Sequence, residues 1–316
     1  MISIAILDDF QNAARSMAQW ERLRGRASLT VFNDHVTGEA LAQRLQVFDV
    51  VMLIRERTPM PRALLARLPR LKLLVTAGWR NRAIDLAACK ERGVLVCGTE
   101  AGSHSTVELA WGLILALARH IPAEDRALRA GRWQTSLGFS LRGKTLGVLG
   151  LGRLGAEVVR IGLAFGMQVI AWSQNLTPEH TASVGARWVD KPTLFAAADV
   201  LTIHLVLSER TRGLVGPAEL ARMKPAAVLV NTSRAGIVDT DALVHALERK
   251  TIAGAGLDVY DVEPLPADAP ILKAPNTVLT PHLGYVTRDS YRIYFGQALE
   301  DIEAWLNGSP IRVMEA

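Results

Sequence analysis

The chain has 316 residues, of which 49% are hydrophobic and 21% are charged, and its net charge is +5. At roughly 100–200 residues per domain this length predicts two domains, and the composition excludes a disordered chain. The basic residues are scattered, with the densest stretch at Arg55–Lys72, so an anionic small molecule explains the positive charge and no nucleic-acid partner is expected.

The first hundred residues alternate apolar runs with helical patterns. Buried strands are predicted at 3–7, 50–54, 71–77 and 93–98. This alternation predicts a parallel sheet with crossover helices. The chain starts directly on its first strand, without the pattern of a signal peptide, and no apolar run approaches the roughly 20 residues that span a membrane. With only 2 cysteines, Cys89 and Cys97, a cytoplasmic location is expected and a disulfide framework is not.

The second half repeats this alternation with stronger signals. Residues 106–120 are apolar almost all round and predict a deeply buried helix, and residues 299–306 predict a last helix that Asn307 and Gly308 end. Six further strands are predicted at 145–151, 167–172, 200–207, 226–232, 252–259 and 276–281. Six strands are the number that a dinucleotide-binding doubly wound sheet needs.

The most specific local motif is a glycine loop between a predicted strand and a predicted helix. It consists of Gly150, Leu151, Gly152, Arg153, Leu154 and Gly155. The first glycine permits a tight turn, the second lets a pyrophosphate approach the backbone, and the third lets the helix pack on the strand. The helix N-terminus would then face the phosphates. The motif therefore predicts dinucleotide binding, with a plain structural turn as the alternative.

The next strand ends where NAD-binding sheets carry an acidic residue for the adenosine ribose. This chain has Ser173 there, followed by Gln174 and Asn175, with no Asp or Glu nearby. Without that carboxylate a 2′-phosphate is not repelled, although no arginine follows to bind it. We therefore expect NAD(P) with a slight preference for NADP; alternatively, Ser173 only ends the strand.

Three polar residues follow predicted strands of the second half: Arg234, Glu263 and His282. The carboxyl ends of parallel strands line the ligand crevice of such sheets. A histidine can take the hydroxyl proton of a hydroxy acid, a carboxylate can orient it, and a planar arginine suits a substrate carboxylate. Each could instead be an ordinary surface or loop residue. No metal is expected, because the histidines are dispersed and neither cysteine stands at ligand spacing.

Five segments of the chain resemble the D-isomer-specific 2-hydroxyacid dehydrogenase family. In chain order they are LRGKTLGVLGLGRLG, ADVLTIHLVLSERTRGLVG, MKPAAVLVNTSRAGIVDTDAL, GAGLDVYDVEP and TVLTPHLG. The resemblance implies two Rossmann-like doubly wound α/β domains. The dinucleotide domain would span 100–282. The flavodoxin-like substrate domain would be discontinuous, 1–99 plus 283–316, with the cleft between the domains. It also implies a homodimer with the helix from Thr106 at its interface.

The family pattern implies roles for individual residues. Arg234 matches the substrate-binding arginine, Glu263 the acid that orients the histidine, and His282 the acid/base, while Asp258 matches the aspartate that contacts the nicotinamide carboxamide. Further residues fall in segments that border the cofactor: Thr106, Glu108, His204, Val206 and Thr232.

The chain departs from the family pattern at three places. The substrate loop, normally Gly-x-Gly, has Gly78, Trp79 and Arg80, and we keep all three as candidates for substrate binding through backbone amides. Ala235-Gly236 replaces Gly-Gly after the arginine. Gly284-Tyr285 replaces Gly-Gly or Gly-Ser after the histidine, which would alter the pocket wall.

Several functions fit the resemblance. The formate dehydrogenase branch is disfavoured because Pro281, not glutamine, precedes His282. Phosphoglycerate dehydrogenase and glyoxylate or hydroxypyruvate reductase activities remain, so the substrate is a small 2-hydroxy or 2-oxo acid whose side chain the sequence does not determine. A cofactor-sensing, corepressor-like binding module on the same fold is the alternative to an enzyme, and a scaffold with a vestigial site is a third hypothesis.

Overall fold

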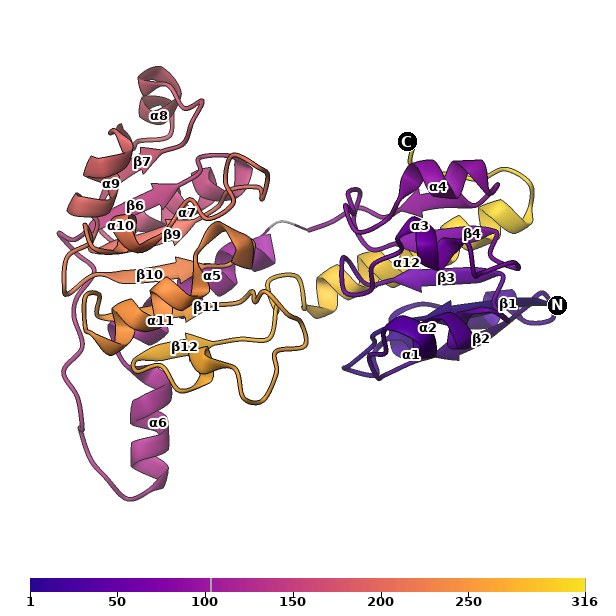
Figure 1. The fold of residues 1–316 in the computed structure, drawn as a ribbon, viewed down its shortest axis with the longest axis horizontal. Helices are drawn as coiled ribbons and strands as arrows, with labels where there is room; N and C mark the ends of the chain where they lie inside the picture. Colours follow the sequence, from indigo (N-terminus) through magenta and orange to yellow (C-terminus); the bar gives the residue numbers. More distant parts are fainter. Residues whose placement is uncertain (103, 316) are drawn as a thin grey trace. The chain divides into compact units, whose positions relative to one another are not determined.

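The chain divides into two compact units, each built on one sheet. The computed structural model describes residues 1–102 and 104–315. The discontinuous unit comprises Met1–Gly102 with Val286–Ala316, and the continuous unit comprises Ser103–Tyr285. These limits lie a few residues from the domain boundaries expected above. All strand pairs of both sheets are parallel, which confirms the expected α/β fold class (Figure 1).

The discontinuous unit has a five-stranded sheet in the order β2-β1-β3-β4-β5, which is the flavodoxin-like order. Its strands are β1 (Ile2–Ile6), β2 (Ala27–Val31), β3 (Val50–Leu53), β4 (Leu73–Thr76) and β5 (Leu95–Gly98). Its helices are α1 (Ala14–Met17), the 3₁₀ helix η1 (Trp20–Leu23), α2 (Gly38–Leu45), α3 (Arg62–Leu65), α4 (Leu86–Glu91) and α12 (Arg288–Leu306). Strands β3 and β4 are buried at every residue, as the continuous apolar runs predict.

Two elements of this unit differ from expectation. Strand β2 was not predicted: it lies at the sheet edge, pairs with β1, and contains no fully buried residue, so its sequence lacks an apolar signal. Helix α12 begins at Arg288, well before the expected start, because the Thr287 side chain accepts the backbone N–H of Ser290 and so caps it. The helix ends before Asn307 and Gly308, as expected.

The continuous unit has a seven-stranded sheet in the order β12-β11-β10-β9-β6-β7-β8. Counted from β6, this is the Rossmann order with one further edge strand, and the order reverses between β6 and β9. Its strands are β6 (Thr145–Leu149), β7 (Gln168–Trp172), β8 (Arg187–Trp188), β9 (Val200–Ile203), β10 (Val228–Asn231), β11 (Gly254–Leu257) and β12 (Thr277–Leu279). The six expected strands are present. The seventh, β8, has two exposed residues and was not predicted.

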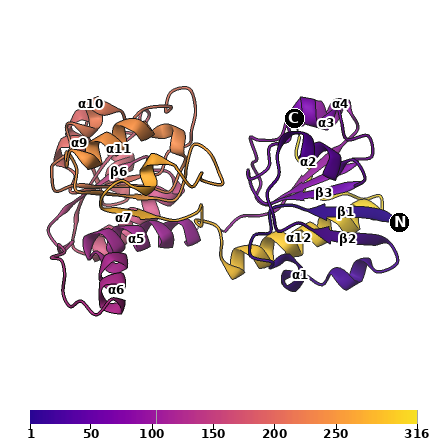
Figure 2. The ribbon, with the colours of Figure 1, turned by 60° about the horizontal axis from the view of Figure 1, so that its bottom comes forward.

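Helices cover both faces of this sheet, as Figures 1 and 2 show. One face carries α5 (His104–Ala118) and α7 (Arg153–Ala164) and packs into one apolar core. The other face packs into a second core through α9 (Lys191–Ala197), α10 (Pro217–Leu220) and α11 (Thr240–Glu248). The remaining elements are α6 (Ile121–Arg129), α8 (Pro178–Ser183), η2 (Ala235–Ile237) and η3 (Pro270–Leu272).

Helix α5 corrects one expectation. Trp111 and Ile114 are buried against the sheet, but Gly112 is exposed and Leu109 and Leu115 are only half-buried. The helix is therefore not buried all round, because within one chain the sheet covers only one of its sides. Among the described residues, 1–102 and 104–315, no helix combines the length and apolar character needed to cross a membrane.

Candidate active site

The candidate catalytic residues follow neighbouring strands of the continuous unit. Arg234 comes after β10, Glu263 after β11 and His282 after β12. Because these strands are parallel and adjacent, their carboxyl ends lie at one edge of the sheet. Two of these side chains are in direct contact there.

His282 and Glu263 form a hydrogen-bonded pair. Nδ1 of His282 lies 2.6 Å from Oε2 of Glu263, and Oε1 of Glu263 accepts the backbone N–H of Tyr260 at 2.9 Å. Burial opposes ionisation of Glu263, but the hydrogen bond and charge of His282, with smaller contributions from Tyr260 and Arg234, lower the pKa of Glu263 below its ordinary value. An ionised carboxylate only accepts, so the proton of this bond lies on Nδ1 and a neutral imidazole keeps its lone pair on Nε2.

The loop that carries His282 is held by Asp258, the residue after β11. Its Oδ1 accepts the Thr280 hydroxyl at 2.6 Å and the N–H of Leu283 at 2.7 Å, and its Oδ2 accepts the N–H of Gly284 at 2.9 Å. Asp258 is completely buried, and this burial raises its pKa. His282 adopts φ +53°, a left-handed conformation that costs a non-glycine residue energy and that these bonds maintain.

Arg234 is half-buried beside this pair. Its Nη1 donates to the carbonyl of Ser233 at 2.7 Å, and its own carbonyl accepts the side-chain amide of Asn231 at 3.0 Å. Its charge contributes to the lowered pKa of Glu263, so the guanidinium acts on the same site.

The glycine loop has the geometry that its motif requires. Gly150 has φ +100°, and a Cβ there would lie 2.7 Å from the carbonyl oxygen of His204. A Cβ on Gly155 would lie 2.3 Å from the carbonyl oxygen of Gly150, so helix and turn are in close contact. A Cβ on Gly152 would meet nothing within 4 Å, and Gly152 is the N-cap residue of α7, which has no side-chain cap. Open space in front of uncapped backbone N–H groups fits a phosphate.

The side chains of the two remaining loop positions differ. Arg153 is exposed, whereas Leu154 is half-buried and packs against the core under α7. Arg153 is therefore a cation at the N-terminus of α7, whereas Leu154 can contact the cofactor mainly through its backbone.

The segment after β7 is polar and lies close to the glycine loop. Ser173 is half-buried, and Gln174 and Asn175 are exposed. The next helix, α8, carries His180, whose Nε2 lies 3.3 Å from the carbonyl oxygen of Leu151. The sequence reasoning missed this histidine, because nothing in its local pattern points back to a loop almost thirty positions earlier.

Two buried polar atoms border the same strand ends without a hydrogen-bond partner among the described residues: Nδ1 of His204 and the Thr232 hydroxyl. Burial lowers the pKa of His204 to about 4, so its ring is neutral, and its Nε2 lies 2.9 Å from the Thr202 hydroxyl. Unpartnered buried polar atoms are costly unless a ligand satisfies them. They fit a bound nicotinamide dinucleotide.

Three further cofactor candidates lie on the segment after β9 and on α5. Val206 is 65% exposed. The Thr106 hydroxyl donates to the carbonyl of Gly284 at 2.9 Å and so ties α5 to the loop after His282. Glu108 is exposed on the same helix.

The candidate substrate loop lies in the discontinuous unit, after β4. Gly78 has φ +89°, and its N–H donates to the Thr99 hydroxyl at 2.9 Å. The Arg55 guanidinium lies directly against Gly78, where a Cβ would be 1.7 Å from Nη1. Trp79 is 50% exposed and Arg80 is exposed. Because the amide of Gly78 is already bonded, the amides of Trp79 and Arg80 are the better candidates for an anion.

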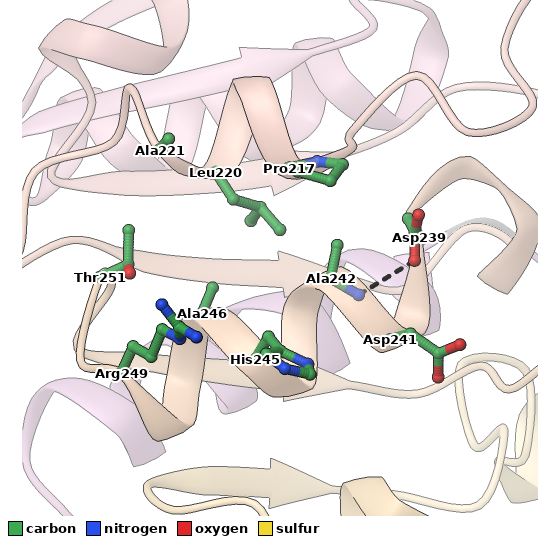
Figure 3. A pocket seen from close by; sticks show the side chains of 10 residues that line it. All are labelled: Pro217, Leu220, Ala221, Asp239, Asp241, Ala242, His245, Ala246, Arg249 and Thr251. Carbon is green, nitrogen blue, oxygen red and sulfur yellow. Dashed lines mark hydrogen bonds between the residues drawn. The ribbon is translucent and has the colours of Figure 1, made fainter.

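A cavity of about 580 Å³ lies elsewhere in the continuous unit, between α10 and α11 (Figure 3). It is lined by Pro217, Leu220, Ala221, Asp239, Asp241, Ala242, His245, Ala246, Arg249 and Thr251. It shares no residue with the candidate site, and Asp239 is engaged in capping α11 through the N–H of Ala242 at 3.0 Å. Within the described part of the chain no group of three or more His, Cys, Asp or Glu residues could hold a metal ion.

Comparison with known proteins agrees with this architecture. Residues 111–284 match the model of the D-isomer specific 2-hydroxyacid dehydrogenase, NAD binding domain. A glyoxylate reductase of Thermococcus litoralis is 37% identical over 265 residues, which are 80% of this chain and 78% of that protein. A D-3-phosphoglycerate dehydrogenase of Archaeoglobus fulgidus is also 37% identical over 278 residues, which are 87% of this chain but only 52% of that protein.

A solved structure is similar over nearly the whole chain. The phosphoglycerate oxidoreductase from Vibrio cholerae O395 has a TM-score of 0.92 and 41% identity, and the match covers 98% of this chain and 100% of that one. The resemblance predicted from the five sequence segments is thereby confirmed. The chain belongs to the D-isomer specific 2-hydroxyacid dehydrogenase family.

Proposed function

We propose that the chain is a cytoplasmic NAD(P)-dependent oxidoreductase that interconverts a small D-2-hydroxy acid and its 2-oxo acid. The observation that carries the proposal is the 2.6 Å contact between His282 and Glu263. This pair lies at the carboxyl ends of strands in the same sheet whose first turn is the glycine loop. Family membership supports the nicotinamide cofactor.

The residues divide the chemistry of the reaction between them. When bound, the nicotinamide ring accepts or supplies the hydride. During oxidation, Nε2 of His282 takes the hydroxyl proton of the substrate, and the Glu263 carboxylate stabilises the imidazolium that forms. During reduction, the same nitrogen returns the proton to the carbonyl oxygen. Arg234 binds the substrate carboxylate.

A single variant tests these roles. His282→Ala is expected to abolish turnover of glyoxylate, hydroxypyruvate, pyruvate and phenylpyruvate while leaving the Kd of the reduced cofactor nearly unchanged. Turnover is followed by cofactor absorbance and Kd by fluorescence titration. Normal turnover in this variant would remove His282 from the mechanism. Cofactor binding without turnover of any 2-oxo acid by the unaltered protein would favour the corepressor-like binding module.

Cofactor choice is proposed from the end of β7. Ser173 stands where a carboxylate would repel a 2′-phosphate, which favours NADP slightly over NAD. Ser173→Asp restores that carboxylate and is expected to weaken NADPH binding by about tenfold or more while sparing NADH. Titration of both reduced cofactors measures this, and Ser183→Asp, on the exposed side of α8, serves as a charge-matched control.

The substrate is proposed at the level of its class. Similar proteins are named glyoxylate reductase, hydroxypyruvate reductase and D-3-phosphoglycerate dehydrogenase, and all these names describe small 2-oxo or 2-hydroxy acids. We assign Gly78, Trp79 and Arg80 to substrate binding, with the amides of Trp79 and Arg80 as anion donors. Arg80→Gly, which restores the family residue, tests whether the Arg80 side chain also selects the substrate.

We further propose a homodimer formed through the continuous unit. Large apolar side chains on α6 and the segment after it are exposed: Ile121, Leu128, Trp133 and Leu137. Exposed apolar side chains that gather on one helix and the segment after it are typical of a protein–protein interface, and this helix follows α5, the helix expected there. Light scattering is expected to give twice the mass of one chain for the unaltered protein. A variant that carries both Trp133→Asp and Leu137→Asp should give the mass of a single chain.

A further inference from the structure

The loop after His282 contains an aromatic side chain that touches the imidazole. Tyr285 is only 8% exposed, and its ring centroid lies 5.4 Å from that of His282, with the ring planes inclined at 65°. This is an edge-to-face arrangement, the favourable geometry for two aromatic rings. The position is one of the departures from the family pattern, which has a small residue there.

The backbone between the two rings is fixed. The N–H groups of Leu283 and Gly284 are both bonded to Asp258, and the carbonyl of Gly284 accepts the Thr106 hydroxyl. The backbone that joins Tyr285 to His282 therefore cannot shift without breaking bonds to a buried carboxylate, and burial of the Tyr285 side chain restricts its rotation. The edge-to-face contact is built into the loop rather than being a chance approach of two mobile side chains.

The bond to Glu263 leaves the imidazole incompletely fixed. A single hydrogen bond at Nδ1 sets the direction of that nitrogen, but the ring can still pivot about the bond. A second contact on the ring removes this freedom, and Tyr285 provides it. Proton transfer requires Nε2 within hydrogen-bond reach of the substrate oxygen, so a pivoting ring would lower the rate of the chemical step.

We propose that Tyr285 is a positioning residue that fixes the plane of the His282 imidazole for proton transfer, together with Glu263. The inference rests on the proposed acid/base role of His282. It assigns to Tyr285 an effect on kcat through the histidine, and not a contact with the substrate.

The first test measures the contact directly. The chain has 7 histidines, so a sample labelled with ¹³C at histidine Cε1 gives few resonances, and the one absent in His282→Ala identifies His282. A neighbouring aromatic ring shifts this resonance through its ring current. We expect the shift to disappear in Tyr285→Leu and Tyr285→Ser and to persist in Tyr285→Phe. An unmoved resonance in Tyr285→Leu would overturn the proposal.

The second test measures the consequence for catalysis. Tyr285→Ser and Tyr285→Leu are expected to lower kcat about twofold to tenfold, the equivalent of one aromatic contact, with KM nearly unchanged and with kcat rescued by Tyr285→Phe. A change in KM at unaltered kcat would show instead that Tyr285 lines the substrate pocket, and it would overturn the positioning role. Tyr285→Leu keeps apolar bulk in case the serine variant folds poorly.

Controls separate this inference from the proposed function and from simple destabilisation. Phe195→Leu also trims a completely buried aromatic residue of the same unit, and it should lower Tm while leaving kcat and the His282 resonance unchanged. If the unaltered protein turned over none of the acids, the proposed function would fail, whereas the resonance would still decide whether the ring contact exists.

Discussion

The two units share a parallel α/β architecture but differ in the first turn after the first strand of each. In the discontinuous unit, Asp9 is completely buried and accepts the N–H groups of Ala13 and Ala14 at 3.0 and 2.9 Å, where α1 begins. In the continuous unit, Gly152 is the N-cap residue of α7, which has no side-chain cap and open space in front of it. One helix N-terminus is satisfied by the chain's own carboxylate, and the other is left for a ligand.

The turn in the discontinuous unit is closed further by Asp8. Its carboxylate bonds to Nδ1 of His35 at 2.7 Å and to the Thr58 hydroxyl at 2.6 Å, and it is 2% exposed. Two carboxylates at this turn would repel a pyrophosphate. The fold alone therefore does not decide which unit binds the dinucleotide; the residues of one turn do.

The strongest effect should come from placing a carboxylate in the glycine loop, in the way that Asp9 stands in the first turn of the discontinuous unit. Gly152→Asp places a carboxylate where the phosphates would lie, and repulsion between two charges about 4 Å apart weakens binding of the reduced cofactor roughly a hundredfold or more. Fluorescence titration measures the Kd. Tm should stay nearly constant, since the side chain points into open space. An unchanged Kd would contradict the assignment of the loop, and Gly152→Asn controls for size without charge.

A second substitution in the same loop should act on stability instead. Gly155→Ala brings a Cβ to within 2.3 Å of the Gly150 carbonyl oxygen, so α7 and the turn must separate. We expect a loss of about 3 kcal/mol in the free energy of unfolding, measured by urea denaturation. Gly152→Ala, whose Cβ meets nothing, is the matched control and should cost well under 1 kcal/mol. Equal losses in the two variants would disprove the distinction between the glycines.

In the first turn of the discontinuous unit, a substitution should instead change the free energy of unfolding and leave cofactor binding unchanged. Asp9→Ala leaves the N–H groups of Ala13 and Ala14 without their acceptor and should cost about 2 kcal/mol of stability with no change in cofactor Kd. Urea denaturation and fluorescence titration measure the two quantities, and Asp9→Asn, which keeps one acceptor oxygen, should lose less. A weaker cofactor affinity in Asp9→Ala would mean that this turn takes part in binding.

The smallest effect concerns another buried carboxylate of the discontinuous unit. Burial raises the pKa of Asp301 to about 7, against the attraction of Arg312, whose Nε donates to it at 2.8 Å. The folded chain then holds this proton more tightly than the unfolded chain, so the contribution to stability is complete at low pH and is lost as the pH rises towards 7.

The test of this sign compares the unaltered protein with Asp301→Asn. The free energy of unfolding of the unaltered protein should fall relative to that of the variant by about 1 kcal/mol between pH 6 and pH 7. A difference that stayed constant over this range would show that Asp301 does not titrate there. Cofactor binding should follow the same pH dependence in both proteins, because the residue lies outside the continuous unit.

Features whose signal is local could be predicted from the amino-acid sequence alone. The apolar runs that became β3 and β4 are buried at every residue, and such runs identify strands covered on both faces. The glycine loop was recognisable because its residues are consecutive and follow a strand. Glu263 and His282 were found as polar residues after strands, and family resemblance supplied their pairing, which the structure shows as a direct contact.

Other features depend on residues far apart in the chain and are visible only in the folded molecule. Strand β2 has no apolar pattern and exists because it pairs with β1. The bonds of Asp258 to the His282 loop, the contact of Arg55 with Gly78 and the packing of Tyr285 on His282 each depend on packing that no local motif records. Local patterns report burial and turn geometry, whereas these contacts depend on how strands and loops come together in space.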